Sequence, residues 1–135
     1  MDYQKLAQQR IESHPFARCL GLSVDEISEG EARCSLKVQD FMLNPVGSVH
    51  GGVLYSLADT TAGSAVISYE NHRITTVDGS LHFLRAAMNI DTLYGRAKVI
   101  KRGKRLSTVH VEILDPEGKL LDDGTFTFFD LDCGA

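Results

Sequence analysis

Hydrophobic and polar positions change their period several times along the chain, and each change predicts a different element. Residues 3–12 follow a helical period, with Asp2 before them as an N-cap candidate. This helix is expected to stop at Ser-His-Pro, residues 13–15, because proline disfavours helical geometry in the residue that precedes it. Residues 20–27 and 31–38 then have the lengths and the turn residues of two strands joined as a hairpin.

The longest helical run follows at residues 50–69. Its core-facing positions fall on one broad face: Val53, Leu54, Leu57, Ala58, Thr61, Ala62, Ala65 and Tyr69. Period-two segments rich in Thr, Val, Ile and Phe then predict four strands: 73–85, 94–102, 106–114 and 119–131. This order indicates a single α+β domain over residues 1–135, with a helical segment at 1–19 and an antiparallel sheet that curls around the long helix.

The opposite face of the long helix is unusual for a surface in contact with water. Its residues are small or uncharged apart from one acid: Tyr55, Ser56, Asp59, Thr60 and Gly63. A solvent-facing helix surface normally carries several long charged side chains. A chain of 135 residues has few elements left to cover a second helix face. We therefore expect this face to meet another copy of the protein, with two-fold symmetry as the commonest arrangement.

Composition and charge narrow the range of functions. The chain is 43% hydrophobic and 24% charged, which is near the average for globular proteins. A formal net charge of −4 disfavours nucleic acid as a partner. The sequence has neither a signal-peptide pattern nor the roughly 20 consecutive apolar residues of a membrane span, so we expect no membrane partner and a cytoplasmic location. Cys19, Cys34 and Cys133 are odd in number and far apart, which argues against disulfides and a zinc site.

Positive charge is unevenly distributed despite the acidic balance. Half of the 14 Lys and Arg residues lie within one segment: Arg85, Arg96, Lys98, Lys101, Arg102, Lys104 and Arg105. One interpretation is a solvated hairpin turn around residues 102–104. The other is a site for a small ligand that carries phosphate groups.

The start of the long helix offers chemistry of its own. His50-Gly51-Gly52 leaves backbone N–H groups without intrahelical acceptors at the positive end of the helix dipole, where an oxyanion can bind. Asp59 lies eight residues beyond Gly51, or about 12 Å along the axis. Catalytic hydrogen bonds span about 3 Å, so the two groups of one chain cannot act together. An antiparallel helix from a second subunit would bring the partner's Asp59 opposite Gly51.

Residues 44–59 resemble the signature of hotdog-fold acyl-CoA thioesterases of the phenylacetic-acid-degradation type, in the 4-hydroxybenzoyl-CoA thioesterase superfamily. The motif is Asn44-x-x-Gly47-x-x-His50-Gly51-Gly52, followed by Leu57-x-Asp59. Shorter matches occur in the same order: Gly21-Leu22, Phe83-Leu84-Arg85-Ala86, Arg102-Gly103-Lys104 and Asp115-Pro116-Glu117-Gly118-Lys119. The resemblance spans about residues 14 to 130. It implies a hotdog fold, a curved antiparallel sheet wrapped around one long central helix, and homodimers that often pair into dimers of dimers.

The resemblance also implies roles for individual residues. The Gly51 N–H would polarise a thioester carbonyl with help from His50, and Asp59 of the partner subunit would act as general base or as nucleophile. Asn44 would position water or substrate, and Thr76 would assist from the same side as Asp59. Coenzyme A would be part of the substrate, and no cofactor or metal is expected. Contacts to the substrate and its coenzyme A are assigned to these residues: Gly52, Arg85, Arg102, Lys104 and Arg105.

Three functions are compatible with this resemblance. The leading one is hydrolysis of an aryl- or medium-chain acyl-CoA to the free acid and coenzyme A. A hotdog dehydratase or hydratase ranks lower, because its Asp-x-x-x-x-His pattern would place His at position 64, where this chain has Ser. A non-catalytic acyl-CoA binding or sensing protein is the third, although a sensor normally carries an output module. The identity of the acyl group, and acyl carrier protein in place of coenzyme A, stay open.

Overall fold

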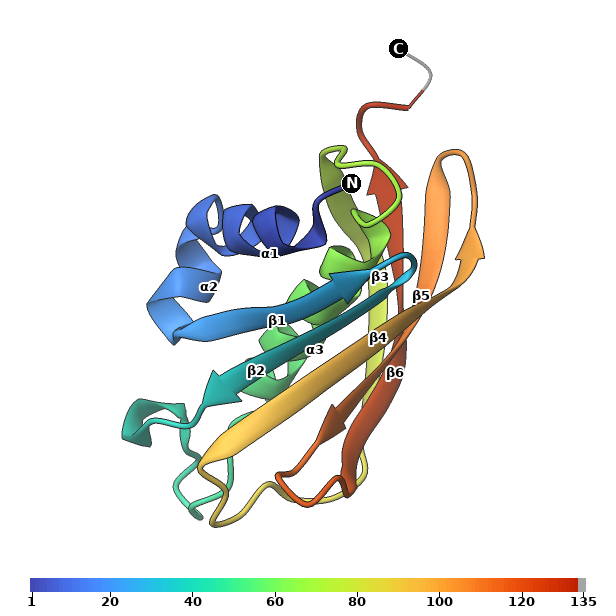
Figure 1. Cartoon of the computed structure of the whole chain (residues 1–135). Helices are drawn as coiled ribbons and strands as arrows, with labels where there is room; N and C mark the ends of the chain where they lie inside the picture. The colour runs from blue at the N-terminus through green and yellow to red at the C-terminus, as the bar shows by residue number, and fades with distance from the viewer. Residues whose placement is uncertain (134–135) are drawn as a thin grey trace.

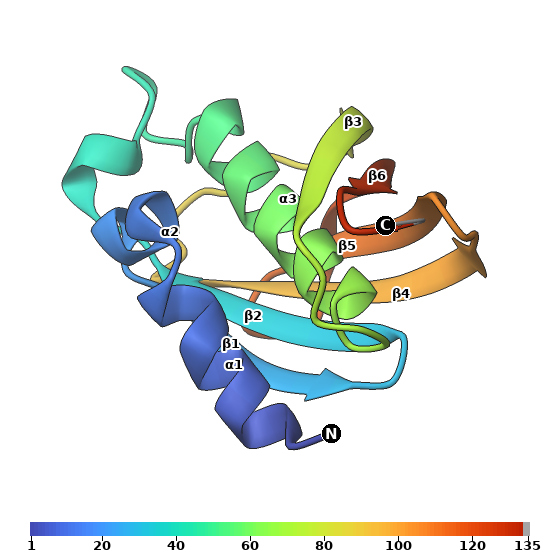
Figure 2. The same cartoon turned by 90° about the horizontal axis from the view of Figure 1, so that it is seen from above.

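The computed structural model describes residues 1–133 and shows an antiparallel sheet curved around a long helix (Figures 1 and 2). Six strands lie in the order β1-β2-β4-β5-β6-β3. Their bounds are β1 Leu22–Ser28, β2 Glu31–Lys37, β3 Ile74–Phe83, β4 Thr92–Arg102, β5 Leu106–Leu114 and β6 Leu120–Asp130. The helix α3, Gly51–Val66, lies along the concave side of the sheet. The predicted α+β class and the sheet curved around a central helix are thus confirmed.

Two short helices precede the sheet. In α1, Tyr3–Glu12, Asp2 is the N-cap and accepts a hydrogen bond from Lys5 N (3.1 Å), as the sequence predicts. The strand predicted at residues 20–27 is present as β1, but it begins two residues later than predicted, at Leu22, because a second helix, α2, occupies Pro15–Leu20. Pro15 ends one helix and begins the next, since proline fits the first turn of a helix, where its missing N–H has no acceptor.

Tight turns join the strands at the positions that the turn residues predict. Gly30 between β1 and β2 has φ +76° and Gly118 between β5 and β6 has φ +85°, a region that favours glycine. Asp115 Oδ1 accepts hydrogen bonds from the backbone N–H groups of Glu117 (2.9 Å) and Lys119 (2.8 Å), which fixes the second turn. A short 3-10 helix, η1, at Asp40–Met42 lies between β2 and α3.

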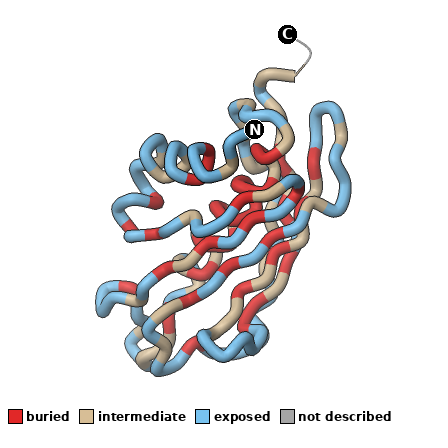
Figure 3. Tube along the Cα trace, viewed as in Figure 1, coloured by how far each residue is buried: buried red, intermediate tan, exposed pale blue. Residues whose placement is uncertain are grey.

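The core lies between α3 and the concave face of the sheet. Helix residues and strand residues there are fully or almost fully buried: Leu54, Leu57, Ala58, Ala62, Ala65, Leu93, Val109, Val111, Ile113 and Phe126. Figure 3 shows buried segments gathered on the strands and α3, and mostly exposed turns around them. The helix is shorter than predicted, because it ends at Val66 with Ile67 as its C-cap. Tyr69 therefore lies outside the helix, although its apolar character fits the predicted stripe.

The second face of α3 is covered in two different ways. Thr60 and Gly63 are buried within the single chain. The sequence pattern predicted that both lie on a face in contact with another copy of the protein. The cover is partly Arg10 of α1, whose Nε donates a hydrogen bond to Ser64 Oγ (3.2 Å). The expectation is wrong for this half of the face, because α1 folds back over it. Tyr55 and Asp59, nearer the helix start, stay only half-buried.

The sheet has two edge strands with different surroundings. The first edge strand, β1, packs against α1. At the other edge, β3 pairs with β6 alone among the described strands. Two of its apolar residues are largely exposed: Val77 at 53% and Phe83 at 55%. A long edge with exposed apolar side chains offers a template for pairing with another chain. No helix within residues 1–133 has the length and apolarity needed to cross a bilayer.

Candidate active site

The start of α3 presents one available amide. His50 is the N-cap residue, and its Nδ1 accepts a hydrogen bond from Gly52 N (2.8 Å). The Gly52 N–H is therefore satisfied within the chain, whereas the structure gives no acceptor to the N–H of Gly51 among residues 1–133. The ring of Phe83 closes one side: a Cβ at Gly51 would lie 3.2 Å from its Cε1. Glycine thus keeps this amide approachable, at the positive end of the helix.

The loop before α3 is held together by Asn44. Its backbone N–H donates to Ser48 O (2.7 Å), and its side-chain Nδ2 donates to Ser48 Oγ (3.2 Å) and Val49 O (3.5 Å). Gly47 has φ +90°, which completes the turn. The side chain of Asn44 is therefore engaged with its own loop and fixes the approach to His50.

Asp59 and Thr76 meet, as the resemblance implies. Thr76 Oγ1 on β3 donates a hydrogen bond of 2.7 Å to Asp59 Oδ1 on α3. Both residues are half-buried. A register shift between Thr76 and Asp78 interrupts the β3–β6 ladder beside this contact. One turn toward the helix start, Tyr55 donates its hydroxyl to Gly79 O (3.2 Å), so the same strand holds this face of α3 twice.

Asp59 and Gly51 remain apart within one chain. They lie on the same straight helix, eight residues and about 12 Å from each other. Asp59 faces β3, the strand with an open outer edge. A single chain therefore carries both halves of the predicted site, separated by two turns of helix.

The predicted coenzyme A contacts divide between two ends of the molecule. Arg102, Lys104 and Arg105 line a cavity of about 460 Å³ near the C-terminal end of α3. Arg85 lines a different cavity of about 470 Å³, together with Lys119. The structure does not bring the four cations together, because the β4–β5 turn and the segment after β3 lie at opposite ends of the sheet (Figure 1).

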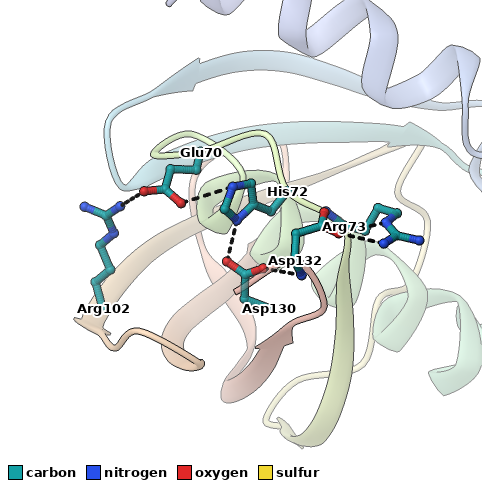
Figure 4. Close-up of polar contacts among 6 residues, drawn as sticks. All are labelled: Glu70, His72, Arg73, Arg102, Asp130 and Asp132. Atoms are coloured by element: carbon teal, nitrogen blue, oxygen red, sulfur yellow. Dashed lines mark hydrogen bonds and ion pairs between the residues drawn. The ribbon is translucent and has the colours of Figure 1, made fainter. Parts of the chain in front are cut away.

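A network of ion pairs forms one wall of the first cavity (Figure 4). Arg102 pairs with Glu70 (3.2 Å) and lies 4.3 Å from the centre of the Tyr69 ring. His72 lies between Asp130, 2.7 Å from its Nδ1, and Glu70, 3.3 Å from its Nε2. The hydrogen bond to Asp130 is the main reason that the pKa of His72 is raised above its usual value. Arg73 pairs with Asp132 (2.6 Å) in the same row.

The same network holds the described residues best placed to share a metal ion. Donor atoms of Glu70, His72 and Asp130 lie within 4.8 Å of one another. Both ring nitrogens of His72 already face carboxylates, and the guanidinium of Arg102 lies against Glu70. These contacts account for the charges of the cluster without an ion, and a nearby guanidinium opposes the binding of a further cation.

Two charged residues have no place in the sequence-based site. Asp122 on β6 is fully buried, and neither of its carboxylate oxygens has a hydrogen-bond partner among the described residues. Burial raises its pKa to about 7. Arg10 reaches the middle of α3 from α1. Both had a signal in the sequence: Asp122 occupies an inward position of a period-two strand, and Arg10 follows the buried Leu6 by four residues on one helix face.

Comparison with known proteins identifies the family to which this chain is similar. Residues 46–121 match the family model of the thioesterase superfamily. The chain is 33% identical over 113 residues to the acyl-coenzyme A thioesterase PaaI of Escherichia coli, covering 84% of this chain and 80% of that protein. Human acyl-coenzyme A thioesterase 13 is 28% identical over 115 residues, covering 83% and 82%.

A solved structure agrees along nearly the full length. The E. coli PaaI protein from the phenylacetic acid degradation operon superposes with a TM-score of 0.89 and 28% sequence identity, over 96% of this chain and 94% of that chain. The curved sheet around α3 is thus a hotdog fold, and the class is that of hotdog thioester hydrolases. The chain belongs to the thioesterase superfamily.

Proposed function

We propose that this protein hydrolyses an aryl- or medium-chain acyl-CoA thioester to the free acid and coenzyme A. The names of the E. coli and human relatives support acyl-CoA as the substrate class. One observation carries the mechanism: α3 has an available amide at Gly51 and a carboxylate at Asp59, which Thr76 orients. These are the two groups that thioester hydrolysis needs, an oxyanion donor and a base or nucleophile.

The complete site is proposed to form between two subunits. A second copy that continues the sheet at the β3 edge, with its α3 antiparallel, would bring the partner's Asp59 to Gly51 of the first chain. Two-fold symmetry then creates two equivalent sites. The half-buried state of Tyr55 and Asp59 and the exposed apolar residues of β3 support this arrangement. We propose that such dimers pair further into dimers of dimers in the cytoplasm.

Hydrolysis requires water to add to the thioester carbonyl and the C–S bond to break. The Gly51 N–H would stabilise the oxygen as it gains negative charge, an effect worth about 10²–10³ in rate. Asp59 of the partner subunit would take the proton of the attacking water, which is worth about 10²–10⁴ in rate. Alternatively, Asp59 would attack the carbonyl carbon itself and expel the coenzyme A thiolate, and water would then hydrolyse the resulting mixed anhydride to the free acid and Asp59. The coenzyme A thiolate leaves and is protonated by solvent. This mechanism uses no metal, and coenzyme A enters only as part of the substrate.

Two further groups are assigned supporting roles. His50 caps α3 by accepting at Nδ1, so its exposed imidazole would carry a proton on Nε2 that can be donated to the substrate carbonyl. Asn44 holds the loop that aims His50 and Gly51. For the coenzyme A nucleotide, an antiparallel dimer would bring Arg102, Lys104 and Arg105 of the partner subunit toward the Gly51 end of α3, where Arg85 of the first subunit lies. Four cations from two chains would then face the phosphates.

The test is release of free thiol from a panel of acyl-CoA thioesters, followed with a thiol-trapping dye. We expect turnover of at least one aryl- or medium-chain substrate, and a loss of at least about 100-fold in Asp59→Asn. Asp78→Asn, on β3 but two residues from Thr76, is the matched control and should retain activity. Equal turnover by Asp59→Asn and the unaltered protein would reject the assignment.

A further inference from the structure

A cavity of about 480 Å³ lies between α1 and the segment that follows α3. Its first wall is one face of α1 with the C-cap residue, because the residues are three and four positions apart: Leu6, Gln9, Arg10 and Ser13. The opposite wall is formed by residues after the helix: Ile67, Asn71, His72, Arg73 and Ile74. Apolar, uncharged polar and basic side chains share this lining, which contains no acid among residues 1–133. A cavity of this volume can hold a small organic molecule.

Arg10 is fixed in the cavity wall by contacts with α3. Its Nε donates a hydrogen bond to Ser64 Oγ (3.2 Å), and Ser64 Oγ donates in turn to Thr60 O (2.7 Å). A Cβ at Gly63 would lie 2.6 Å from Nη2 of Arg10, so glycine leaves the space that this nitrogen occupies. The structure gives neither Nη nitrogen an acceptor among residues 1–133, and neither is sealed from solvent. The guanidinium therefore has a fixed position and donors left for another partner.

The charges of the cavity wall are unevenly balanced. His72 lies 2.7 Å from a carboxylate oxygen of Asp130. Arg73 pairs with Asp132 (2.6 Å). No carboxylate of residues 1–133 lies at ion-pair distance from Arg10, although burial lowers the pKa of its guanidinium. A largely buried cation without an ion-pair partner is costly, so an anion in the cavity would be stabilised.

We propose that this cavity binds a small monocarboxylate with an apolar body, and that the Nη groups of Arg10 hold its carboxyl group. A guanidinium presents N–H groups in a fork that matches the two oxygens of a carboxylate. One unbalanced positive charge suits a single negative charge better than the two charges of a phosphate group. Leu6, Ile67 and Ile74 offer apolar contacts for the rest of the ligand. The site lies outside the proposed active site and does not depend on the proposed function.

A purely structural role for Arg10 makes a different prediction. Arg10 lies in the last turn of α1, where a cation is favoured, and its hydrogen bond to Ser64 joins α1 to α3. If that were its only role, octanoate would bind no better than its neutral analogue octanamide, and removing the charge would change stability alone.

The experiment measures binding of octanoate, octanamide and inorganic phosphate by isothermal titration calorimetry. We expect saturable binding of octanoate, and binding of the other two at least about tenfold weaker. Arg10→Gln keeps an amide donor for Ser64 and removes the charge, so the Kd for octanoate should rise about tenfold or more. Arg73→Met removes a cation that is paired and largely exposed, and should leave this Kd within about threefold.

Two substitutions on α1 form a matched pair, because Gln9 lines the cavity and Gln8 does not. Both side chains are exposed, so either change to Glu should preserve the fold. Gln9→Glu places a negative charge in the cavity wall and should raise the Kd for octanoate about threefold or more. Gln8→Glu adds the same charge outside the cavity and should leave the Kd nearly unchanged, because solvent screens it.

The methyl NMR signal of Ile67 separates this site from the proposed active site. The signal is assigned by its loss in Ile67→Val. Octanoate should shift it in the unaltered protein and also in Gly51→Val, whose new side chain crowds the proposed active site. A shift that survives in Gly51→Val supports the second site even if no acyl-CoA is hydrolysed, an outcome that would refute the proposed function alone. Loss of the shift in Gly51→Val would mean that octanoate occupies the proposed active site, and would overturn the inference.

The affinities decide the remaining outcomes. The proposal is overturned by a lack of saturable octanoate binding, or by equal affinity for octanamide or phosphate. It is also overturned by an unchanged Kd in folded Arg10→Gln, or by equal Kd values in Gln9→Glu and Gln8→Glu. The midpoint of thermal unfolding checks each variant, and the pair of glutamine variants carries the test if Arg10→Gln does not fold.

Discussion

The two halves of the outward face of α3 differ in what covers them. From Thr60 onward, the face is closed by the chain itself, through Arg10 and its hydrogen bond to Ser64. From Gly51 to Asp59, the face keeps an available amide and a carboxylate that accepts one hydrogen bond from residues 1–133. Buried polar groups are normally satisfied within a fold, so polar groups left open on an otherwise apolar helix indicate where a substrate or second chain acts.

The largest expected change in activity comes from mixing subunits that carry different substitutions in the open half of this helix face. Asp59→Asn removes the carboxylate, and Gly51→Val keeps the backbone N–H but crowds the approach to it with a branched side chain. Each homodimer should lose at least about 100-fold in activity. A mixed dimer, purified through two different tags, has one site with both lesions and one intact site. It should recover about half of the activity of the unaltered dimer, because the two sites are equivalent. Mixed dimers as inactive as their parents would show that each site lies within one chain.

The sheet beneath the helix also holds an unpaired polar group among residues 1–133, the buried carboxyl of Asp122 on β6. Its strand neighbours are Phe83, whose ring contacts Gly51, and Ile113. Because the folded-state pKa of Asp122, about 7, lies above the 3.8 usual for an aspartate, the folded state binds the proton more tightly than the unfolded state does. The contribution of Asp122 to the free energy of unfolding is therefore fully present below about pH 4. It is lost as pH rises from about 4 through 7, which lowers the free energy of unfolding by a few kcal/mol.

The measurement for Asp122 is urea unfolding at pH 5.0 and pH 8.5. Asp122→Asn should flatten the decline in unfolding free energy between these values, since the amide does not ionise. Asp123→Asn, on the same strand but paired with His110, is the control. A decline of equal size in Asp122→Asn would mean that the buried carboxyl is not its source.

Thr76→Val tests whether the hydrogen bond to Asp59, in the open half of the helix face, contributes to catalysis. Valine has nearly the same shape and removes the hydroxyl that bonds Asp59 Oδ1. A hydrogen bond to a charged group contributes about 1.5–3 kcal/mol, so kcat should fall about tenfold or more. Steady-state kinetics measure the effect, with Thr75→Val on the other face of β3 as control. Unchanged kcat would leave Thr76 with a packing role alone.

The smallest predicted effect concerns the phosphate contacts. Replacing Arg102, Lys104 or Arg105 singly by Ala should raise KM for acyl-CoA severalfold, with kcat nearly unchanged, because exposed charges are screened by solvent. Added salt should weaken the effect further. The comparison substrate is an acyl-pantetheine, which has no nucleotide phosphates and should show no change in KM. Equal effects on both substrates would contradict a role in nucleotide binding.

The sequence predicted local structure well where the signal is local. The start of α3 follows from His50-Gly51-Gly52, and the turn at Asp115 follows from Pro and Gly at fixed offsets. The end of α3 was placed three residues too late, because Tyr69 continues the apolar stripe and no glycine or proline marks the stop. The strand predicted from residue 20 begins two residues later, at Leu22, because the helix that starts at Pro15 extends to Leu20.

The candidate site divides in the same way. The sequence by itself determined the residues of the motif, the amide at the start of α3 and the lone acid on its face, since these depend on spacing along one helix. The resemblance already implied that Thr76 acts from the same side as Asp59, but only the tertiary structure decided that the two form a hydrogen bond, that Asp122 is buried and that Arg10 packs over Gly63. These contacts join residues 17 to 54 positions apart in the Thr76 and Arg10 pairs, and such distances are closed by packing of the whole chain, which no local period encodes.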